Sequence, residues 1–557
     1  MKKISIIIPC YNVENYIWDC FQSLKEQSIG VEFLELIWVD DASTDTTWQK
    51  LTEIEQDCPE SVMIIRCEEN GKVGTARNVG LAYASASYVA FMDADDWAEP
   101  SMYEKMYDRA EQYSCDVVCC DYLRDTHPNS GMMPAGQNNE NDRLLLIDNI
   151  EKRKQFILAG SMGYTAWNKL LRKDIIFDNE IFFPDKLMYE DNYWTPLLYM
   201  YVSRVYIITE KLYHYRLNYQ SAVLNPKPDY FNDFLRVNLV KWQEWQEREL
   251  LETYYDEFVY DFLSTGYLGY LKMLFLRSKK PAFEAFEELK TAVLERIPDY
   301  ESNPYLTSHV TPFNQLLLNM LKLPVTADTF KQVTFQARIN WQKVTIFVAA
   351  HVTFPVPYDN IYQPIHVGKA GGGDLGYPGD DTGNHISHLN KYYGELTGLY
   401  WIWKNYHGAD YIGLCHYRRY FINEQGSILN KEDYIRLLLD YDVIIAKPLH
   451  NDRTAYDIYG EAHNIQDLQA VQRAIEKLYP AYIPHFQAVM YGNNSYVGNL
   501  FVTTKGLWDA YAEWLFAVFQ EASAEIDSEH YDSYHRRVYG FLSEQLLFVW
   551  IQANGLS

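Results

Sequence analysis

Short apolar runs alternate with segments of helical spacing over the first 125 residues. The apolar runs are nearly continuous and rich in β-branched side chains, which is typical of strands buried on both faces of a parallel sheet. This alternation of strand and helix predicts a doubly wound α/β sheet that binds its ligands at the carboxyl ends of the strands. The expected strands cover residues 4–8, 34–40, 62–67, 88–93 and 115–122, and the expected helices cover 14–27, 46–57, 72–84 and 102–113.

The pattern changes further along the chain. Residues 126–150 are rich in Pro, Gly and Asn and are predicted to form a mobile excursion or lid. From about residue 228 the spacing is helical, and Val344–Ala350 begins a second stretch of strand and helix alternation. We therefore predict a domain over 1–227, a helical connector over 228–340 and a second α/β domain over 341–557.

The charge balance excludes one large class of function. The 557 residues include 49 Lys and Arg against 75 Asp and Glu, which gives a formal net charge of −26. A nucleic-acid-binding protein needs a basic face to replace phosphate counterions, so we expect no nucleic-acid partner. The aromatic share of 16%, with 47 Tyr and 14 Trp, suits stacking on sugar rings as well as packing of a bulky core.

Two further patterns bear on location. The chain opens directly into an expected strand without a cleavage site, and no run of 18 or more apolar residues occurs in it. None of the eight cysteines belongs to a CxxC pair. We therefore expect a reduced, cytoplasmic protein with small buried thiols.

Three carboxylates follow the apolar strand that ends near residue 92. Asp93, Asp95 and Asp96 would repel one another at this strand end unless a cation neutralised them. Oxygen ligands of this kind suit Mg²⁺ or Mn²⁺, which keep their remaining positions for water and substrate phosphates. A structural carboxylate cluster is the alternative interpretation.

A second acidic pair, Glu190 and Asp191, occurs about 100 residues later. Such a carboxylate can act as a general base if burial raises its pKa toward neutrality. A solvated charge pair is the alternative. The glycine-rich stretch 71–80 contains Arg77 but has neither Walker nor dinucleotide-binding spacing, which disfavours kinases and dehydrogenases.

These segments together resemble the family 2 glycosyltransferases of GT-A fold. The matching motifs are PCYN (9–12), VDDASTD (39–45), GTARNVG (74–80), DADD (93–96), WNKL (167–170) and the ED pair at 190–191. The resemblance implies an inverting transferase in which Asp191, with Glu190 beside it, deprotonates the acceptor hydroxyl. It further implies a metal held by Asp93 and Asp95, and a nucleotide sugar held by Pro9, Tyr11, Asn12, Asp41, Arg77 and Asp93.

The C-terminal half contains a comparable strand end with different chemistry. The apolar run 411–415 leads into His416, Arg418 and Arg419, just as the run ending at residue 92 leads into carboxylates. The planar fork of arginine can hold phosphate oxygens directly, so we expect a second nucleotide-sugar site that needs no metal. An arginine pair buried in structural salt bridges is the alternative.

This half is similar to the family known as domain of unknown function 4422, which occurs among capsular and exopolysaccharide genes. The similarity rests on VAAH (348–351), YQPIHVG (362–368), GELTGLYWIWKN (394–405), GLCHYRRYF (413–421) and GFLSEQLLFVW (540–550). Some members are associated with glycosyl transfer, notably of galactofuranose. Residues 384–387 read NHIS where the family usually has DNIS, and Glu544 is the candidate base.

The sequence thus predicts a bifunctional glycosyltransferase that builds a surface polysaccharide or glycoconjugate from nucleotide-diphosphate sugars. The first domain is expected to be metal-dependent and inverting, and the second metal-independent. The alternative is a single active transferase with a C-terminal glycan-binding or scaffolding module. The acceptor is expected to be a glycan or a lipid-linked glycan. The amphipathic segment 267–280 has a basic end, which suits helix packing or peripheral contact with the inner face of the cell membrane.

Overall fold

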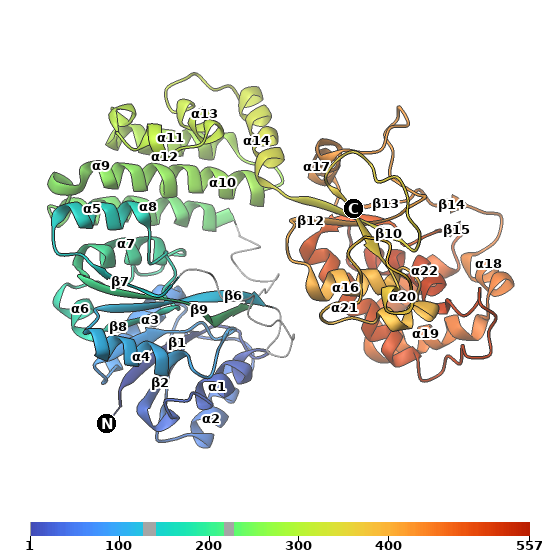
Figure 1. Cartoon of the computed structure of the whole chain (residues 1–557), viewed down its shortest axis with the longest axis horizontal. Helices are drawn as coiled ribbons and strands as arrows, with labels where there is room; N and C mark the ends of the chain where they lie inside the picture. The colour runs from blue at the N-terminus through green and yellow to red at the C-terminus, as the bar shows by residue number, and fades with distance from the viewer. Residues whose placement is uncertain (1, 126–140, 217–227) are drawn as a thin grey trace. The chain divides into compact units, whose positions relative to one another are not determined.

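The computed structural model describes residues 2–125, 141–216 and 228–557, and the chain divides into two compact units (Figure 1). The first unit is Met1–Ala327 and the second is Asp328–Ser557. Each unit has its own sheet and its own hydrophobic core. The predicted α/β class is confirmed in both units.

The sheet of the first unit begins with four parallel strands in the order β3-β2-β1-β4. Ile4 pairs with Leu34 on one side and with Tyr88 on the other, so β1 lies at the centre of this half. Complete burial of the β1 isoleucines explains the continuous apolar run in the sequence. The elements are β1 (Ile4–Cys10), α1 (Ile17–Lys25), β2 (Leu34–Asp40), α2 (Thr47–Asp57), β3 (Val62–Arg66), α3 (Lys72–Tyr83), β4 (Tyr88–Phe91) and α4 (Met102–Tyr113).

The sheet becomes mixed beyond β4, where the order among described residues continues β4-β8-β6-β9-β5 with β7 on β9. β8 runs antiparallel to β4, and β6 and β9 run parallel with an irregular register near Cys120. Residues 126–140 of the predicted lid lie outside the described residues, whereas Arg143–Leu146 forms β7. The remaining elements are β5 (Trp97–Ala98), β6 (Val117–Asp125), α5 (Ile150–Ala159), β8 (Lys169–Arg172), α6 (Lys173–Asp178), α7 (Asp191–Tyr201) and β9 (Arg204–Arg216).

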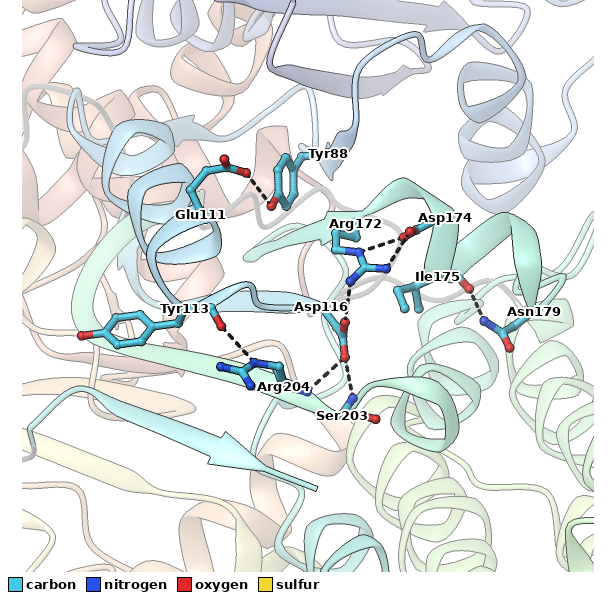
Figure 2. A network of polar contacts seen from close by, with 10 residues as sticks. All are labelled: Tyr88, Glu111, Tyr113, Asp116, Arg172, Asp174, Ile175, Asn179, Ser203 and Arg204. Atoms are coloured by element: carbon cyan, nitrogen blue, oxygen red, sulfur yellow. Dashed lines mark hydrogen bonds and ion pairs between the residues drawn. The ribbon is translucent and has the colours of Figure 1, made fainter. Parts of the chain in front are cut away.

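A polar network fastens the amino-terminal edge of this sheet (Figure 2). Asp116 precedes β6 and accepts hydrogen bonds from the backbone N–H groups of Ser203 and Arg204, at 2.6 and 3.0 Å. Its other oxygen accepts a hydrogen bond of 3.3 Å from Arg172 at the end of β8. One buried carboxylate therefore joins three strands at the edge opposite to the carboxyl ends of β1 and β4.

A helical layer follows the sheet and belongs to the first unit (Figure 1). α8 packs against α7, and α9 packs against α5, with the Trp245 and Phe258 rings stacked 4.0 Å apart. The segment is helical as expected, and residues 228–327 belong to the first unit. The limits of a separate connector, 228–340, stay a prediction. The layer comprises α8 (Pro228–Glu247), α9 (Leu251–Asp261), the π-helical turn η2 (Phe262–Tyr267), α10 (Leu268–Arg277), α11 (Phe283–Arg296), α12 (Leu306–His309) and α13 (Pro312–Asn319).

The second unit repeats the strand pattern of the first on a smaller scale. In this described part of the chain, β11 and β12 lie parallel to β10 on either side of it, and β16 and then β13 follow as antiparallel neighbours. The sequence β11-β10-β12-β16 thus matches β2-β1-β4-β8 in strand direction. The strands are β10 (Val344–Ala350), β11 (Tyr362–His366), β12 (Tyr411–His416), β13 (Val443–Ile445) and β16 (Phe501–Thr504).

Long helices cover the sheet of the second unit and bury large aromatic side chains such as Trp508 and Tyr511. None of the helices in the described residues is long and apolar enough to cross a membrane. The helices are α14 (Ala327–Trp341), α15 (Asn390–Tyr393), α16 (Leu396–Asn405), α17 (Lys431–Asp440), α18 (Ala455–Ala462), α19 (Ile465–Leu478), α20 (Ile483–Met490), α21 (Lys505–Ala522) and α22 (Val538–Ala553).

Candidate active site

A cavity of about 1110 Å³ opens at the carboxyl ends of β1 and β4 in the first unit. This is the position at which parallel sheets bind their ligands. Seven of the residues that the sequence singled out in this unit line the cavity, although they lie as much as 182 positions apart: Pro9, Tyr11, Arg77, Asp93, Asp95, Glu190 and Asp191.

Asn12 and Asp41 do not belong to the cavity lining, and both accept hydrogen bonds from the backbone of neighbouring loops. The Asn12 side chain accepts a hydrogen bond of 2.8 Å from the backbone N–H of Thr44, which joins the loops after β1 and β2. Asp41 is buried and accepts a bond of 2.8 Å from the backbone N–H of Gly71. Burial raises the pKa of Asp41, and hydrogen bonds from the backbone N–H groups of Gly71 and Lys72 partly oppose the rise. Their direct contact with a nucleotide stays a prediction.

Arg77 lies between two carboxylates at the base of the cavity. Its Nη2 contacts Asp93 at 2.8 Å, its Nη1 forms an ion pair with Glu190, and the guanidinium is buried. The ring of Phe183 packs against it at 5.3 Å. Burial by itself lowers the pKa of Arg77, but the surrounding carboxylates, with Asp93 first among them, raise it above its ordinary value. The guanidinium is therefore charged at any working pH and fixes the acidic groups around it.

The two acidic residues before α7 differ in their contacts. Glu190 is 5% exposed, and burial raises its pKa to about 7 despite the opposing charge of Arg77. Asp191 begins the helix and accepts a hydrogen bond of 3.0 Å from the Asn192 side chain. Burial also raises the pKa of Asp191, and Arg77 opposes that rise. Because Glu190 is already engaged in an ion pair with Arg77, Asp191 is the better placed of the two to accept a proton.

Local backbone geometry holds this acidic pair close to α3. A Cβ atom at Gly74 would lie 3.0 Å from the carbonyl oxygen of Pro184 and 3.2 Å from the Glu190 side chain, so only glycine fits there without displacement. Tyr189, immediately before the pair, has a φ of 63°, a left-handed conformation that is strained for a bulky residue. Strain of this kind is common where a loop must present functional groups.

The three carboxylates after β4 separate into two roles. Asp93 and Asp95 line the cavity, whereas Asp96 is 1% exposed and accepts hydrogen bonds from the Tyr213 hydroxyl at 2.6 Å and the Arg216 backbone at 2.7 Å. Burial raises the pKa of Asp96 well above its ordinary value. Asp96 therefore anchors β9, and two carboxylates remain for a cation.

The two remaining carboxylates fit a catalytic Mg²⁺ or Mn²⁺. Among the described residues, no group of three or more acidic, His or Cys side chains could hold a metal by itself. Mg²⁺ is commonly bound by one or two carboxylates together with substrate phosphates and water, and Asp93 and Asp95 supply that donor set. Arg77 contacts only one oxygen of Asp93.

The helical layer contributes groups to this site that sequence reasoning missed. Asp233 on α8 forms an ion pair with Lys72 and accepts a hydrogen bond of 3.2 Å from the backbone N–H of Met188. The neighbouring Phe234 packs edge-on against Tyr189 at 5.2 Å. α8 thus fixes the loop that carries Glu190 and Asp191. The only sequence signal was the helical spacing from about residue 228, which did not indicate contact with the first domain.

The carboxyl ends of the parallel strands in the second unit carry basic side chains. Arg418 and Arg419 are both exposed, and neither forms an ion pair with any residue that the structure describes. The alternative of a pair buried in salt bridges is therefore wrong. His416 at the end of β12 packs against the ring of Tyr417 at 4.5 Å. Burial lowers the pKa of His416, and Glu395 partly restores it.

Glu544 on α22 faces this strand end. Its Oε1 accepts a hydrogen bond of 2.8 Å from the backbone N–H of Gly498. A Cβ at Gly498, where φ is 85°, would lie 3.0 Å from an Arg419 nitrogen, so the glycine brings the arginine and the carboxylate together. Burial raises the pKa of Glu544 to about 7, Glu395 adds to the rise, and Arg419 opposes it.

Glu395 is a second carboxylate of this cluster, and sequence reasoning did not single it out. It precedes α16 and accepts a hydrogen bond of 2.9 Å from the Asn499 side chain, whose carbonyl oxygen accepts one of 2.6 Å from Ser543. This chain of bonds connects the start of α16, the loop before β16 and α22. The GEL segment at 394–396 contained the residue, but its partner lies 104 positions away.

Comparisons with known proteins agree with this division into two parts. Residues 5–177 match the family described as glycosyl transferase family 2, and residues 345–555 match domain of unknown function DUF4422. The putative glycosyltransferase EpsH of Bacillus subtilis (strain 168) is 27% identical over 260 residues, which are 46% of this chain and 72% of EpsH.

A second relative is the poly(ribitol-phosphate) beta-N-acetylglucosaminyltransferase TarS of Staphylococcus aureus (strain MW2). It is 25% identical over 309 residues, which are 53% of this chain and 51% of TarS, so the match spans about half of that protein. The crystal structure of residues 1–349 of S. aureus TarS in complex with UDP-GlcNAc is 20% identical. It covers 61% of this chain and 91% of that one, with a TM-score of 0.44.

The family matches contain most of the residues of the two sites, although Glu190 and Asp191 lie beyond the first match. The glycosyl transferase family 2 match contains the strand ends at Pro9 and Asp93, and the DUF4422 match contains His416, Arg419 and Glu544. Residues 5–177 are accordingly a glycosyltransferase domain of family 2, and they are joined in this chain to a member of the DUF4422 family at residues 345–555.

Proposed function

We propose that the chain is a bifunctional glycosyltransferase that adds two sugars, one from each unit, to a surface polysaccharide or glycoconjugate. The observation that carries the first activity is that Glu190 and Asp191 line one cavity together with Asp93, Asp95 and Arg77, the last three of which lie in the segment that matches glycosyl transferase family 2. Nucleotide-diphosphate sugars are the proposed donors. The strand-end cluster around Glu544 supports the second activity.

In the first unit, Asp191 acts as the base of a single displacement. It takes the proton of the acceptor hydroxyl, and that oxygen attacks the anomeric carbon of the donor sugar. The bond between the anomeric carbon and the diphosphate oxygen breaks, and the nucleoside diphosphate leaves with the bonding electrons. A single displacement inverts the anomeric centre. Arg77 holds Glu190 and Asp93 in fixed positions around the reacting groups.

Asp93 and Asp95 would hold Mg²⁺ or Mn²⁺ in this unit. The cation would neutralise the charge that develops on the diphosphate leaving group. The backbone of Asp95 is fixed, because its carbonyl oxygen accepts a hydrogen bond of 2.5 Å from the Arg216 side chain. The carboxylates therefore meet the donor in a prearranged position, and no reorganisation of the strand end is required.

In the second unit, Glu544 is the proposed base, and Arg418, Arg419 and His416 form the proposed donor site. The exposed arginines, which form no ion pair with a described residue, supply fixed positive charge where the first unit would use a cation. A pKa of about 7 allows Glu544 to accept a proton near neutral pH. Galactofuranose is the proposed sugar, because the sequence resembles a family whose members include galactofuranosyltransferases.

The relatives support a bacterial surface polymer as the acceptor. TarS is named for transfer to poly(ribitol-phosphate), and EpsH is named a putative glycosyltransferase. We propose a glycan or a lipid-linked glycan as acceptor here, with the protein in the cytoplasm and in peripheral contact with the inner membrane face when the acceptor is lipid-linked.

The test is product analysis with the intact chain and UDP sugars, including UDP-GlcNAc and UDP-galactofuranose. Mass spectrometry should show two successive additions in the wild type, one addition in Glu544→Gln and none in Asp191→Asn. If Glu544→Gln and the double variant Arg418→Ala/Arg419→Ala both leave two additions intact, the second unit is not a transferase. A glycan-binding or scaffolding module would then be the better description.

A further inference from the structure

The cavity of the first unit has a wall that the proposed transfer chemistry does not use. α9, the π-helical turn η2 and α10 line the same cavity as Asp93 and Asp191. A π-helical turn is rare and is frequently found at functional sites. At about 1110 Å³ the cavity exceeds a common single-ligand pocket, so it has room for a donor and part of an acceptor.

Two carboxylates that lie one turn apart on α9 differ in their hydrogen bonding, and the difference indicates which ligand groups this wall can bind. Asp261 is saturated, because its oxygens accept hydrogen bonds from Lys241 and from the Tyr164 hydroxyl, both at 2.5 Å. Glu257 is 1% exposed and lines the cavity, and its Oε1 accepts a hydrogen bond of 2.6 Å from the Tyr305 hydroxyl and lies 3.8 Å from the Lys154 ammonium. Its buried Oε2 accepts no hydrogen bond from any described residue. A buried carboxylate oxygen without a donor is costly unless a ligand supplies one.

Aromatic rings lie in the same lining and suit the faces of sugars. Trp167 is held by stacking on Tyr213 at 4.3 Å and on Tyr215 at 5.8 Å, so its orientation is fixed. Tyr260, on the same helix as Glu257, also lines the cavity. Rigid rings beside an open hydrogen-bond acceptor are the combination that binds a carbohydrate, since the ring packs on C–H groups and the acceptor receives a hydroxyl.

Positive charge marks the remaining part of this lining. Arg124, Lys272 and Arg277 all line the cavity and are exposed. Within the described residues, none of the three forms an ion pair, although the chain has a net charge of −26. Three unpaired cations in an acidic protein attract an anionic ligand group.

We propose that this wall, formed by α9, η2 and α10, is an acceptor subsite for a phosphate-bearing glycan. Glu257 receives a sugar hydroxyl, and Lys272, Arg277 and Arg124 hold the phosphate. The inference rests on the proposed transfer in the first unit, and it adds the chemical class of the acceptor. The phosphate can belong to a glycosyl diphosphate on a lipid carrier or to a phosphodiester in a polymer.

The test compares three synthetic acceptors with the intact chain: a short-chain alkyl diphosphate glycoside, an oligomer of ribitol phosphate and a neutral alkyl glycoside. We expect Lys272→Ala/Arg277→Ala to raise the acceptor KM at least tenfold for the phosphate-bearing acceptor that the wild type prefers. The KM for the neutral glycoside should change less than twofold. The preferred acceptor identifies the source of the phosphate.

Glu257→Gln should raise the acceptor KM for charged and neutral acceptors alike, because the sugar contact is shared. Lys280→Ala is the matched control, since Lys280 is exposed in the same basic segment but does not line the cavity. The melting temperature of each variant shows whether it folds. If Glu257→Gln does not fold, the surface double variant Lys272→Ala/Arg277→Ala still tests the subsite.

Release of UDP from the donor in the absence of acceptor distinguishes a failure of the proposed function from a failure of the proposed acceptor subsite. If the wild type neither cleaves nor transfers any donor sugar, the proposed function fails. If the wild type transfers sugar but the Lys272→Ala/Arg277→Ala variant keeps its acceptor KM within twofold for every acceptor, the acceptor subsite is wrong.

Discussion

The carboxyl ends of β4 and β12 occupy equivalent places in their sheets but carry opposite charge. Each strand lies parallel to the first strand of its unit on one side and antiparallel to a later strand on the other. Asp93 and Asp95 follow β4, whereas His416, Arg418 and Arg419 end or follow β12. Under the proposed function, one topology would bind a diphosphate in two opposite ways, through a recruited cation at β4 and through fixed arginines at β12.

The largest expected effect tests the acidic strand end. Asp95→Ala should lower the first transfer by about 10²–10³-fold, the cost of losing one strong electrostatic stabiliser. A chelator should do the same, and both should leave the second transfer intact when an acceptor already carrying the first sugar is supplied. Rates of UDP release measure both steps. Asp108→Ala, an exposed acid on α4, is the control, and equal loss in the control would contradict the proposal.

The next effect tests the base of the second unit. Glu544→Gln keeps the shape and can still accept the bond from Gly498, yet it cannot take a proton. The second transfer should fall by about 10²–10³-fold. In the wild type its rate should rise with pH through about 7, because Glu544 must be deprotonated to act. The variant should lose this rise in a pH–rate profile, and a profile that matches the wild type would exclude Glu544 as the base. Glu513→Gln, exposed on α21, is the control.

A smaller effect is expected at the basic strand end. Arg419→Ala should lower the second transfer by about 10–10²-fold, the value of one hydrogen bond to a charged group. Arg419→Lys should recover only part of this loss, since lysine lacks the planar fork. Steady-state kinetics of the second step measures both variants. Loss of the first transfer as well would mean that the arginine acts on folding and not on a donor.

The smallest effect concerns stability. A folded-state pKa of about 7 for Glu544, against an ordinary value of 4.5, favours the protonated form in the native state. Stability is therefore full below about pH 4.5 and falls as pH rises from 4.5 to 7. At pH 8 the loss is of order 1–3 kcal/mol, which Glu544→Gln should remove. Calorimetry at pH 5 and pH 8 should show the variant melting higher only at pH 8.

Most of the parallel core was predictable from sequence because its signal is local. The run at residues 34–40 coincides with β2, and the helical spacing at 102–113 coincides with α4. Both patterns follow from burial within a short segment, which each stretch of sequence records by itself.

The roles of particular side chains were less predictable, because their partners are distant. Asp96 belonged to a predicted group of three carboxylates, but it binds Tyr213 and Arg216 some 120 positions later. The function of Asp233 depends on Lys72, which is 161 positions earlier. No local pattern contains such pairs, since only the folded chain brings them together.

The tether between Asp233 and the loop before α7 has a consequence for how such enzymes diversify. The same helical segment that positions the proposed base continues into α9 and α10, which line the cavity. A recombination event that exchanged this segment would replace both the support of Asp191 and the surface beside it. Exchange of the whole segment would therefore change the specificity for the acceptor and also displace the proposed base. Single substitutions along α9 and α10 would change the specificity and leave the position of the base intact.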